Sequence, residues 1–153
     1  MKQLFTFGAN GDLIAEFVRQ GVRFLVVGGL AVKFYAPERE ADDLDILLEQ
    51  TPENASRLFR AFGVLHLTPS FPEALIASPS DRQQQLPLKV VYYADIVTTG
   101  KDIDFDSEWA RASEAMIWQS PVRIASRDLL TFMKHRAGRE KDLADVALLE
   151  RGG

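Results

Sequence analysis

Cysteine is absent from the 153-residue sequence, and histidine occurs only twice, as His66 and His135. The absence of cysteine excludes disulfide bonds and thiolate metal sites, and it is compatible with a reducing compartment such as the cytoplasm. With so few nitrogen and sulfur ligands, a zinc site of the usual kind is not expected. Any metal ion must be held mainly by oxygen, which points to magnesium, manganese or calcium.

Long apolar runs are also lacking. No stretch is long and apolar enough to span a bilayer, and the first residues carry no apolar signal core with a cleavage site. We therefore expect a cytoplasmic protein without membrane contacts. The formal net charge of −4 gives no overall positive field, so strong non-specific binding to DNA or RNA is not expected. The composition is that of an ordinary globular protein, and we expect a single domain over residues 1–153.

The segment from Val22 to Leu48 carries the main functional signal. It opens with a short apolar run of β-formers, Phe24–Val27, which predicts a buried strand. Gly28 and Gly29 end this run, and the residues that follow, Leu30–Tyr35, predict a short helix. Glycines at such a turn let backbone N–H groups approach a phosphate, whose charge the helix N-terminus favours. The pair alone is a weak signal, since it matches neither the dinucleotide-binding pattern nor a P-loop.

A second strand is predicted at Asp43–Leu48. Strand side chains alternate between faces, so Asp43 and Asp45 point the same way as Leu47, while the leucines and isoleucine between them point into a core. Two carboxylates side by side on an otherwise apolar strand are costly unless a cation neutralises them. The pair is therefore either a pair of metal ligands or an accident of a strand edge.

Asp95 adds a third acid, within the long β-prone run Leu88–Thr98, which we expect to form one strand. An acid inside an apolar strand needs a partner, and the nearest bases along the chain are Lys89 and Lys101. Three carboxylates on adjacent strands can hold two Mg²⁺ ions about 3.5–4 Å apart, which bridge nucleotide phosphates during an in-line displacement. The sequence thus favours a site for magnesium and a nucleoside triphosphate, held by three acids: Asp43, Asp45 and Asp95.

Charge is unevenly distributed along the chain. Between Glu38 and Glu53 there are seven acids and one base, Arg39, whereas Arg127–Lys141 carries five bases and two acids. A metal-holding acidic segment and a phosphate-holding basic segment would belong together in one cleft, but the counts alone favour two solvated faces. Arg39 is interpreted as either a phosphate ligand or a structural ion-pair partner. Lys134 is either a phosphate ligand or an ordinary surface lysine.

The rest of the chain is predicted to alternate between helices and strands. We expect helices at Leu13–Gln20, Glu53–Phe62, Phe105–Ala112, Arg127–Arg136 and Glu140–Glu150. We expect short strands at Val64–Leu67, Ala115–Gln119 and Val122–Ala125. The expected helix caps are Asn10 or Asp12, Thr51 and Ser126. The irregular segment Pro69–Pro87 is expected to form a hairpin with a mobile tip.

Taken together, these residues resemble a known pattern. Gly28-Gly29-x-Ala31, then Arg39, then Asp43-x-Asp45, then a lone acid on a later strand resembles the DNA polymerase β-like nucleotidyltransferase superfamily. The sequence is most similar to its small prokaryotic members, some of which belong to toxin–antitoxin or abortive-infection systems. The C-terminal run from Ser126 to Glu150 resembles the helix pair that ends these proteins; its polar positions here are Lys134, Arg139, Lys141, Asp142 and Asp145.

The resemblance implies an α+β (α/β) fold, with a mixed sheet and helices packed mainly on one face. It implies two Mg²⁺ ions and transfer of a nucleotidyl group from a nucleoside triphosphate such as ATP to a hydroxyl of an unknown acceptor: RNA, protein or a small molecule. By matching position, Asp43, Asp45 and Asp95 are the metal ligands, and Asp95 is also the base on the acceptor side. Gly28 and Gly29 are expected to hold the triphosphate.

Two departures from the family pattern keep alternatives open. Ala41 stands where the family often has Ser or Thr, and the chain offers no separate acceptor-recognition domain. The main alternative is a non-catalytic relative that binds a nucleotide or a cognate partner protein, such as one half of a toxin–antitoxin pair. A third possibility is an acidic domain without an active site, which predicts that Asp95 lies far from Asp43 and Asp45.

Overall fold

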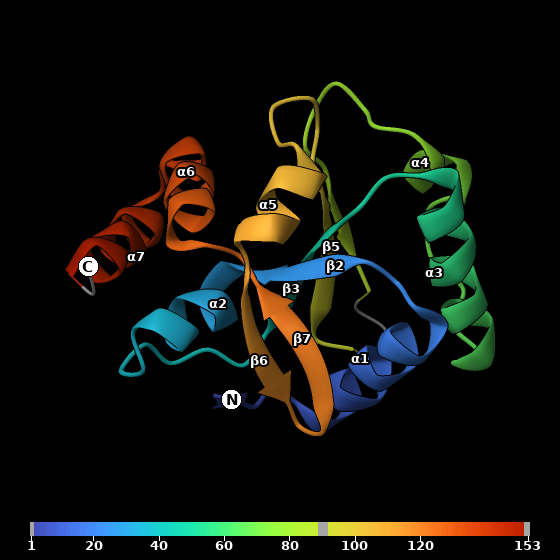
Figure 1. Ribbon diagram of the computed structural model, residues 1–153, viewed down its shortest axis with the longest axis horizontal. Coiled ribbons are helices and arrows are strands. Elements are labelled where there is room, and N and C mark those ends of the chain that lie inside the picture. Colours follow the sequence, from blue (N-terminus) through green and yellow to red (C-terminus); the bar gives the residue numbers. More distant parts are fainter. Residues whose placement is uncertain (1, 89–91, 152–153) are drawn as a thin grey trace.

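A seven-stranded mixed sheet runs through the computed structural model, which describes residues 2–88 and 92–151 (Figure 1). The sheet order is β1-β6-β7-β2-β3-β5-β4. The pairs β1–β6, β7–β2 and β3–β5 are parallel, and the other neighbours are antiparallel. This mixed sheet with packed helices confirms the predicted fold class. The strands are β1 Gln3–Leu4, β2 Phe24–Val27, β3 Leu44–Leu48, β4 Gln85–Pro87, β5 Ala94–Thr98, β6 Ser113–Ile117 and β7 Ser120–Ile124.

Seven helices accompany the sheet in the described residues: α1 Gly8–Gln20, α2 Gly28–Tyr35, α3 Pro52–Val64, α4 Ala74–Ala77, α5 Phe105–Arg111, α6 Arg127–Ala137 and α7 Glu140–Arg151. Two predicted caps are confirmed, because the hydroxyls of Thr51 and Ser126 each accept a backbone N–H three residues on, at 3.1 Å. The cap predicted for the first helix is wrong: α1 starts at Gly8, so Asn10 and Asp12 both lie inside the helix. Within the described ranges, no helix combines the length and apolar character needed to cross a membrane.

The predicted strand Val64–Leu67 is wrong, since α3 continues to Val64 and the chain then turns back on the helix. The N–H groups of Leu65 and Leu67 donate to the carbonyls of Ala61 and Phe62, at 3.0 and 2.9 Å. These hydrogen bonds close the helix end, so the residues are unavailable for strand pairing.

The predicted single strand Leu88–Thr98 is also wrong over its first half. Strand β4 runs antiparallel to β5, and the Leu88 N–H donates to the Ala94 carbonyl at 2.9 Å, so the chain reverses between these residues. Residues 89–91 of the predicted strand lie outside the described residues. The segment Pro69–Pro87, predicted to form a hairpin, instead contributes α4 and then β4. Apolar periodicity does not reveal the change of direction between β4 and β5, because the residues on both sides of it are β-prone.

The two faces of the sheet differ in what covers them. Phe24 of β2 pairs with Leu48 of β3, and the Phe17 ring of α1 lies 6.0 Å from Phe24 and from Phe62 of α3. Helices α1 and α3 therefore cover the Leu48 face. Asp45 points to the opposite face because it is three residues from Leu48 along the strand. Near that face, α2 contacts both α6 and α7, which pack together beside the sheet (Figure 1).

Candidate active site

Asp45 and Asp95 are direct partners in the parallel ladder between β3 and β5. Partners in a ladder point to the same face of the sheet, so the two carboxylates leave the sheet side by side. Asp43, just before β3, lines the same cavity. The three acids that the sequence predicted as a group are therefore brought together, and the expectation that Asp95 lies far from Asp43 and Asp45 is wrong.

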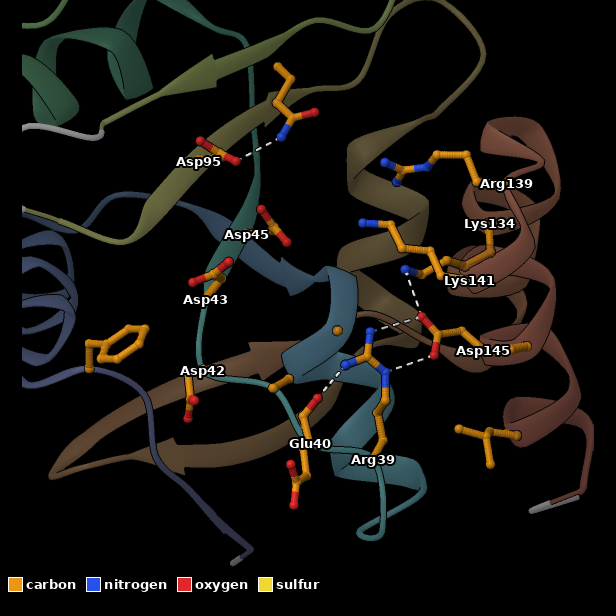
Figure 2. Close-up of a pocket in the computed structure, with 16 residues that line it drawn as sticks. Arg39, Glu40, Asp42, Asp43, Asp45, Asp95, Lys134, Arg139, Lys141 and Asp145 are labelled. Carbon is orange, nitrogen blue, oxygen red and sulfur yellow. Dashed lines mark hydrogen bonds and ion pairs between the residues drawn. The ribbon is translucent and has the colours of Figure 1, made fainter.

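These acids form one wall of a cavity of about 840 Å³. Across it stand basic side chains from the two C-terminal helices: Lys134 of α6, Arg139 of the loop before α7, and Lys141 of α7 (Figure 2). The acidic and the basic segment of the sequence thus share one cleft, and the interpretation as two separate solvated faces is wrong. A cleft with opposed walls of opposite charge suits a ligand that combines divalent cations with phosphates.

The acidic wall carries an unbalanced negative charge. Burial and the neighbouring charge of Asp95 raise the pKa of Asp45 to about 6. The Asp95 Oδ2 atom accepts a hydrogen bond from the Gln85 amide at 2.7 Å. Its other oxygen, Oδ1, is buried and finds no hydrogen-bond partner among residues 2–88 and 92–151. Buried carboxylate oxygens without partners are costly, and a divalent cation relieves that cost. The carboxylate chemistry of this wall therefore fits Mg²⁺.

The side chains are not yet arranged around an ion. Within the part of the chain that the structure describes, no group of three or more His, Cys, Asp or Glu side chains is arranged to hold a metal ion. Binding by Asp43, Asp45 and Asp95 thus requires their carboxylates to rotate toward a common point. Asp45 and Asp95 already share a register position, so their carboxylates start from neighbouring points on one face of the sheet.

The two glycines make room for charged neighbours. Gly28 has a φ of 70°, and a Cβ there would overlap a carboxylate oxygen of Asp45. A Cβ on Gly29 would lie 3.0 Å from the Arg39 Nη2 atom and 3.3 Å from the Ala41 Cβ atom. Gly28 is therefore required for Asp45 to occupy its position, and Gly29 lets Arg39 and Ala41 pack closely against the turn. Gly29 lines the cavity. The triphosphate contacts expected of Gly28 and Gly29 stay a prediction.

Arg39 and Lys134 share one buried carboxylate. Asp145 of α7, whose side chain is 4% exposed, accepts from Arg39 Nε at 2.8 Å and from Arg39 Nη2 at 3.2 Å. The Lys134 ammonium lies 3.0 Å from the second Asp145 oxygen. Both predicted phosphate ligands line the cavity, yet each is also a structural ion-pair partner. The pairing fixes the loop after α2 against the C-terminal helices.

Asp142 and Asp145 were not predicted as site residues. Asp142, 1% exposed, accepts from the Arg139 side chain at 2.7 Å and from the Arg139 backbone N–H at 3.2 Å. Burial alone would raise the pKa of both acids, but hydrogen bonds from Arg139, Arg39 and Lys134 outweigh it and hold both pKa values below the usual range. Both acids therefore stay ionised and keep the basic side chains in place. The sequence signals of this arrangement are the family resemblance, which places both acids at polar positions of the C-terminal helix pair, and two acids three residues apart on a helix next to several bases.

Comparisons with known proteins bear on the fold. No protein-family model matches the sequence, and no curated protein has a similar sequence. The crystal structure of the lincosamide antibiotic adenylyltransferase LnuA, with lincomycin bound, superposes with a TM-score of 0.62 at 14% identity, over 98% of this chain and 99% of LnuA. An antigenic nucleotidyltransferase-like protein from Paracoccidioides brasiliensis, also 14% identical, covers 90% of this chain and 71% of its own, with a TM-score of 0.47. The LnuA match shows that this chain has a nucleotidyltransferase fold.

Proposed function

We propose that this protein is a magnesium-dependent nucleotidyltransferase that moves a nucleotidyl group from a nucleoside triphosphate to a hydroxyl. The observation that supports this most is the register of Asp45 and Asp95 on one wall of a cavity whose opposite wall is basic. Asp43, Asp45 and Asp95 would hold the ions. Bound Mg²⁺ would neutralise the triphosphate and favour the ionised form of the attacking hydroxyl.

In the proposed reaction, the other side chains of the cleft accept a proton or bind phosphate. The acceptor hydroxyl attacks the α-phosphorus, the bond from this phosphorus to the bridging oxygen breaks, and pyrophosphate leaves with the electron pair. Asp95 takes the hydroxyl proton. The basic wall, with Lys134, Arg139 and Lys141, binds the departing phosphates, and the Gly29 turn at the start of α2 directs backbone N–H groups toward them.

The acceptor is best taken as a small molecule. LnuA is described as an adenylyltransferase for lincosamide antibiotics, and its structure contains lincomycin. The cavity of about 840 Å³ falls within the size of pockets that take small ligands. ATP is therefore the first donor to test, and RNA or protein acceptors are the outcomes that would redirect the assignment.

The test uses each α-labelled nucleoside triphosphate with Mg²⁺, and scores metal-dependent binding and slow hydrolysis, in which water takes the labelled nucleotidyl group as nucleoside monophosphate and pyrophosphate is released. We expect Asp43→Asn, Asp45→Asn and Asp95→Asn each to lower pyrophosphate release by about 100-fold or more. Asp81→Asn, which changes an exposed acid outside the cavity, is the matched control. Absence of any metal-dependent nucleotide binding in the wild-type protein would remove the proposal.

One observation favours a second function. Ala41 lines the cavity and places a methyl group beside Gly29, where related proteins often have a hydroxyl. A non-catalytic nucleotide-binding module, such as a toxin–antitoxin component, predicts metal-dependent triphosphate binding without turnover. If Ala41→Ser restores pyrophosphate release to a protein that binds but does not react, this second function replaces the first.

A further inference from the structure

Two exposed aromatic rings lie next to each other at the candidate active site. The Phe7 side chain lines the cavity and is 40% exposed, and Tyr93 is 59% exposed. Their ring centroids are 4.3 Å apart, with the ring planes tilted by 40°. Exposed apolar surface costs roughly 25 cal/mol per Å², so a pair of large rings left open beside a cavity marks a surface that a ligand can cover.

A buried amide holds the Phe7–Tyr93 pair in place. Asn10, fully buried, accepts from the Tyr93 N–H at 3.0 Å and donates to the Tyr93 carbonyl at 3.0 Å and to the Thr6 hydroxyl at 2.9 Å. The Thr6 hydroxyl in turn donates to the Asp42 carbonyl. A satisfied buried polar network of this kind specifies one arrangement of the backbone. It therefore fixes the start of α1 and the residues that lead into both acidic strands.

The Phe7–Tyr93 pair lies on the acidic side of the cleft. Tyr93 precedes Asp95 by two residues, and its carbonyl also accepts the Leu44 N–H at 2.9 Å, which places it at the head of the β3–β5 ladder. In the proposed function the triphosphate occupies the basic wall opposite. The acceptor must then approach from the acidic wall, on the side of Asp95 and the Phe7–Tyr93 pair.

The charge of this wall restricts the chemistry of the acceptor. Glu40 and Asp42 line the cavity in addition to the three acids that would bind metal, so negative charge remains after Mg²⁺ has bound. Aromatic faces bind apolar rings and, by cation–π attraction, protonated amines. The acids would repel an anionic acceptor. They would attract a cationic acceptor, and the aromatic faces would attract it as well.

We propose that the Phe7–Tyr93 pair is the acceptor subsite, and that it takes a hydroxyl-bearing small molecule with an apolar ring face and a protonated amine. This inference rests on the proposed function, because it uses the opposite wall for the triphosphate. Phe7 and Tyr93 contact the acceptor, and Asn10 is a positioning residue that holds their backbone.

The test uses three probes that share the phenyl glucoside and differ in the charge of the para substituent: 4-(aminomethyl)phenyl, phenyl and 4-carboxyphenyl β-D-glucopyranoside. Each is titrated into the full chain with Mg²⁺ while the protein NMR spectrum is recorded. We expect the amine to bind most tightly and the carboxylate at least about tenfold more weakly than the amine. Phe7→Ala and Tyr93→Ala should each weaken binding of the amine about fivefold to tenfold, and Phe7→Tyr should restore it.

Phe5→Ala is the matched control for Phe7→Ala. Phe5 lies two residues away, is 52% exposed, and packs against Trp118 with ring centroids 4.9 Å apart, outside the cavity lining. It should leave binding of the amine unchanged. The subsite is disproved if the amine does not bind, if the carboxylate binds best, or if Phe7→Ala weakens binding no more than Phe5→Ala.

Triphosphate binding to the wild-type protein, measured by calorimetry with Mg²⁺, separates the two proposals. Triphosphate binding without binding of the amine disproves the acceptor subsite and leaves the nucleotidyltransferase intact. Binding of the amine without triphosphate binding disproves the nucleotidyltransferase, and with it the assignment of this surface as an acceptor subsite.

Discussion

Asp45 of β3 stands opposite Asp95 of β5 in a parallel ladder, so that two carboxylates share one face of the sheet at the same register position. With Asp43 beside them, they place three acids on one wall, and the pKa of Asp45 rises to about 6 through burial and the charge of Asp95. A fold that keeps such an arrangement without a cation loses stability.

The first prediction concerns the stability of the metal-free protein. The folded pKa of Asp45, about 6, is above the value of 3.8 in an unfolded chain. The stability that its protonation gives is therefore complete below pH 4 and is lost as the pH rises through 6. Asp45→Asn should stabilise the metal-free protein against urea by roughly 2 kcal/mol at pH 7.5, and should have little effect at pH 4. If Asp45→Asn is less stable than the wild-type protein at pH 7.5, burial and repulsion by Asp95 do not destabilise the ionised Asp45 carboxylate.

The second prediction concerns relief by Mg²⁺. At pH 7.5 the ion should raise the thermal midpoint of the wild-type protein, with a stabilisation of about 1.4 kcal/mol when its concentration is ten times its Kd. The increase in thermal midpoint should be smaller below pH 6, since protons compete with the ion for Asp45. Differential scanning calorimetry at constant ionic strength measures the thermal midpoint with and without Mg²⁺. An equal increase in Asp95→Asn would mean that the ion binds elsewhere.

The third prediction concerns the glycine turn. Gly28→Ala requires a left-handed backbone at an alanine and overlaps the Asp45 carboxylate, so we expect a loss of roughly 2 kcal/mol or more and loss of Mg²⁺ binding. Gly63→Ala is the control, because a Cβ there meets no atom within 4 Å and the residue is helical. It should stabilise the protein by about 0.5–1 kcal/mol. Urea unfolding compares the two, and equal effects would argue against the close approach at Gly28.

The fourth prediction compares two ion pairs that join the loop after α2 to α7. Asp145→Asn removes the buried partner of Arg39 and Lys134 and should cost about 2 kcal/mol at pH 7. Because the pKa of Asp145 is lowered on folding, this difference should narrow as the pH falls below 4. Glu38→Gln breaks the exposed pair with Arg151 and should have no measurable effect. Equal losses in the two variants at pH 7 would mean that the buried network does not hold the helices.

The sequence predicted those parts of the fold, such as helix caps and buried strands, that depend on interactions between neighbouring residues. The caps Thr51 and Ser126 and the strand that contains Asp45 depend on a few neighbouring residues, and all three are confirmed, although the strand starts at Leu44 and not at Asp43. The reversal between Leu88 and Ala94 was missed, since two β-prone arms give the same periodicity as one strand. The two-residue strand β1 was missed because its pairing with β6 is decided by residues more than a hundred positions away.

Some residues of the candidate site could likewise be predicted from the sequence, and others could not. Grouping Asp95 with Asp43 and Asp45 was possible because an acid in an apolar strand is costly wherever the strand lies. The buried carboxylates Asp142 and Asp145 were not predicted as site residues, since their burial depends on how separate elements pack: Arg39 reaches Asp145 from the loop after α2, and Lys134 of α6 reaches both acids. The Phe7–Tyr93 pair had no signal either, because two aromatics 86 residues apart look like ordinary core residues until the fold leaves them exposed.

The most direct test is the location of the divalent ion. Crystals of the full chain grown with Mn²⁺ and a non-hydrolysable ATP analogue would be measured at the manganese absorption edge. We predict anomalous peaks at coordination distance, about 2.0–2.3 Å, from carboxylate oxygens of Asp43, Asp45 and Asp95, and no such peaks in Asp45→Asn crystals. A bound analogue with no anomalous peak at these three residues would contradict the metal site and the proposed function built on it.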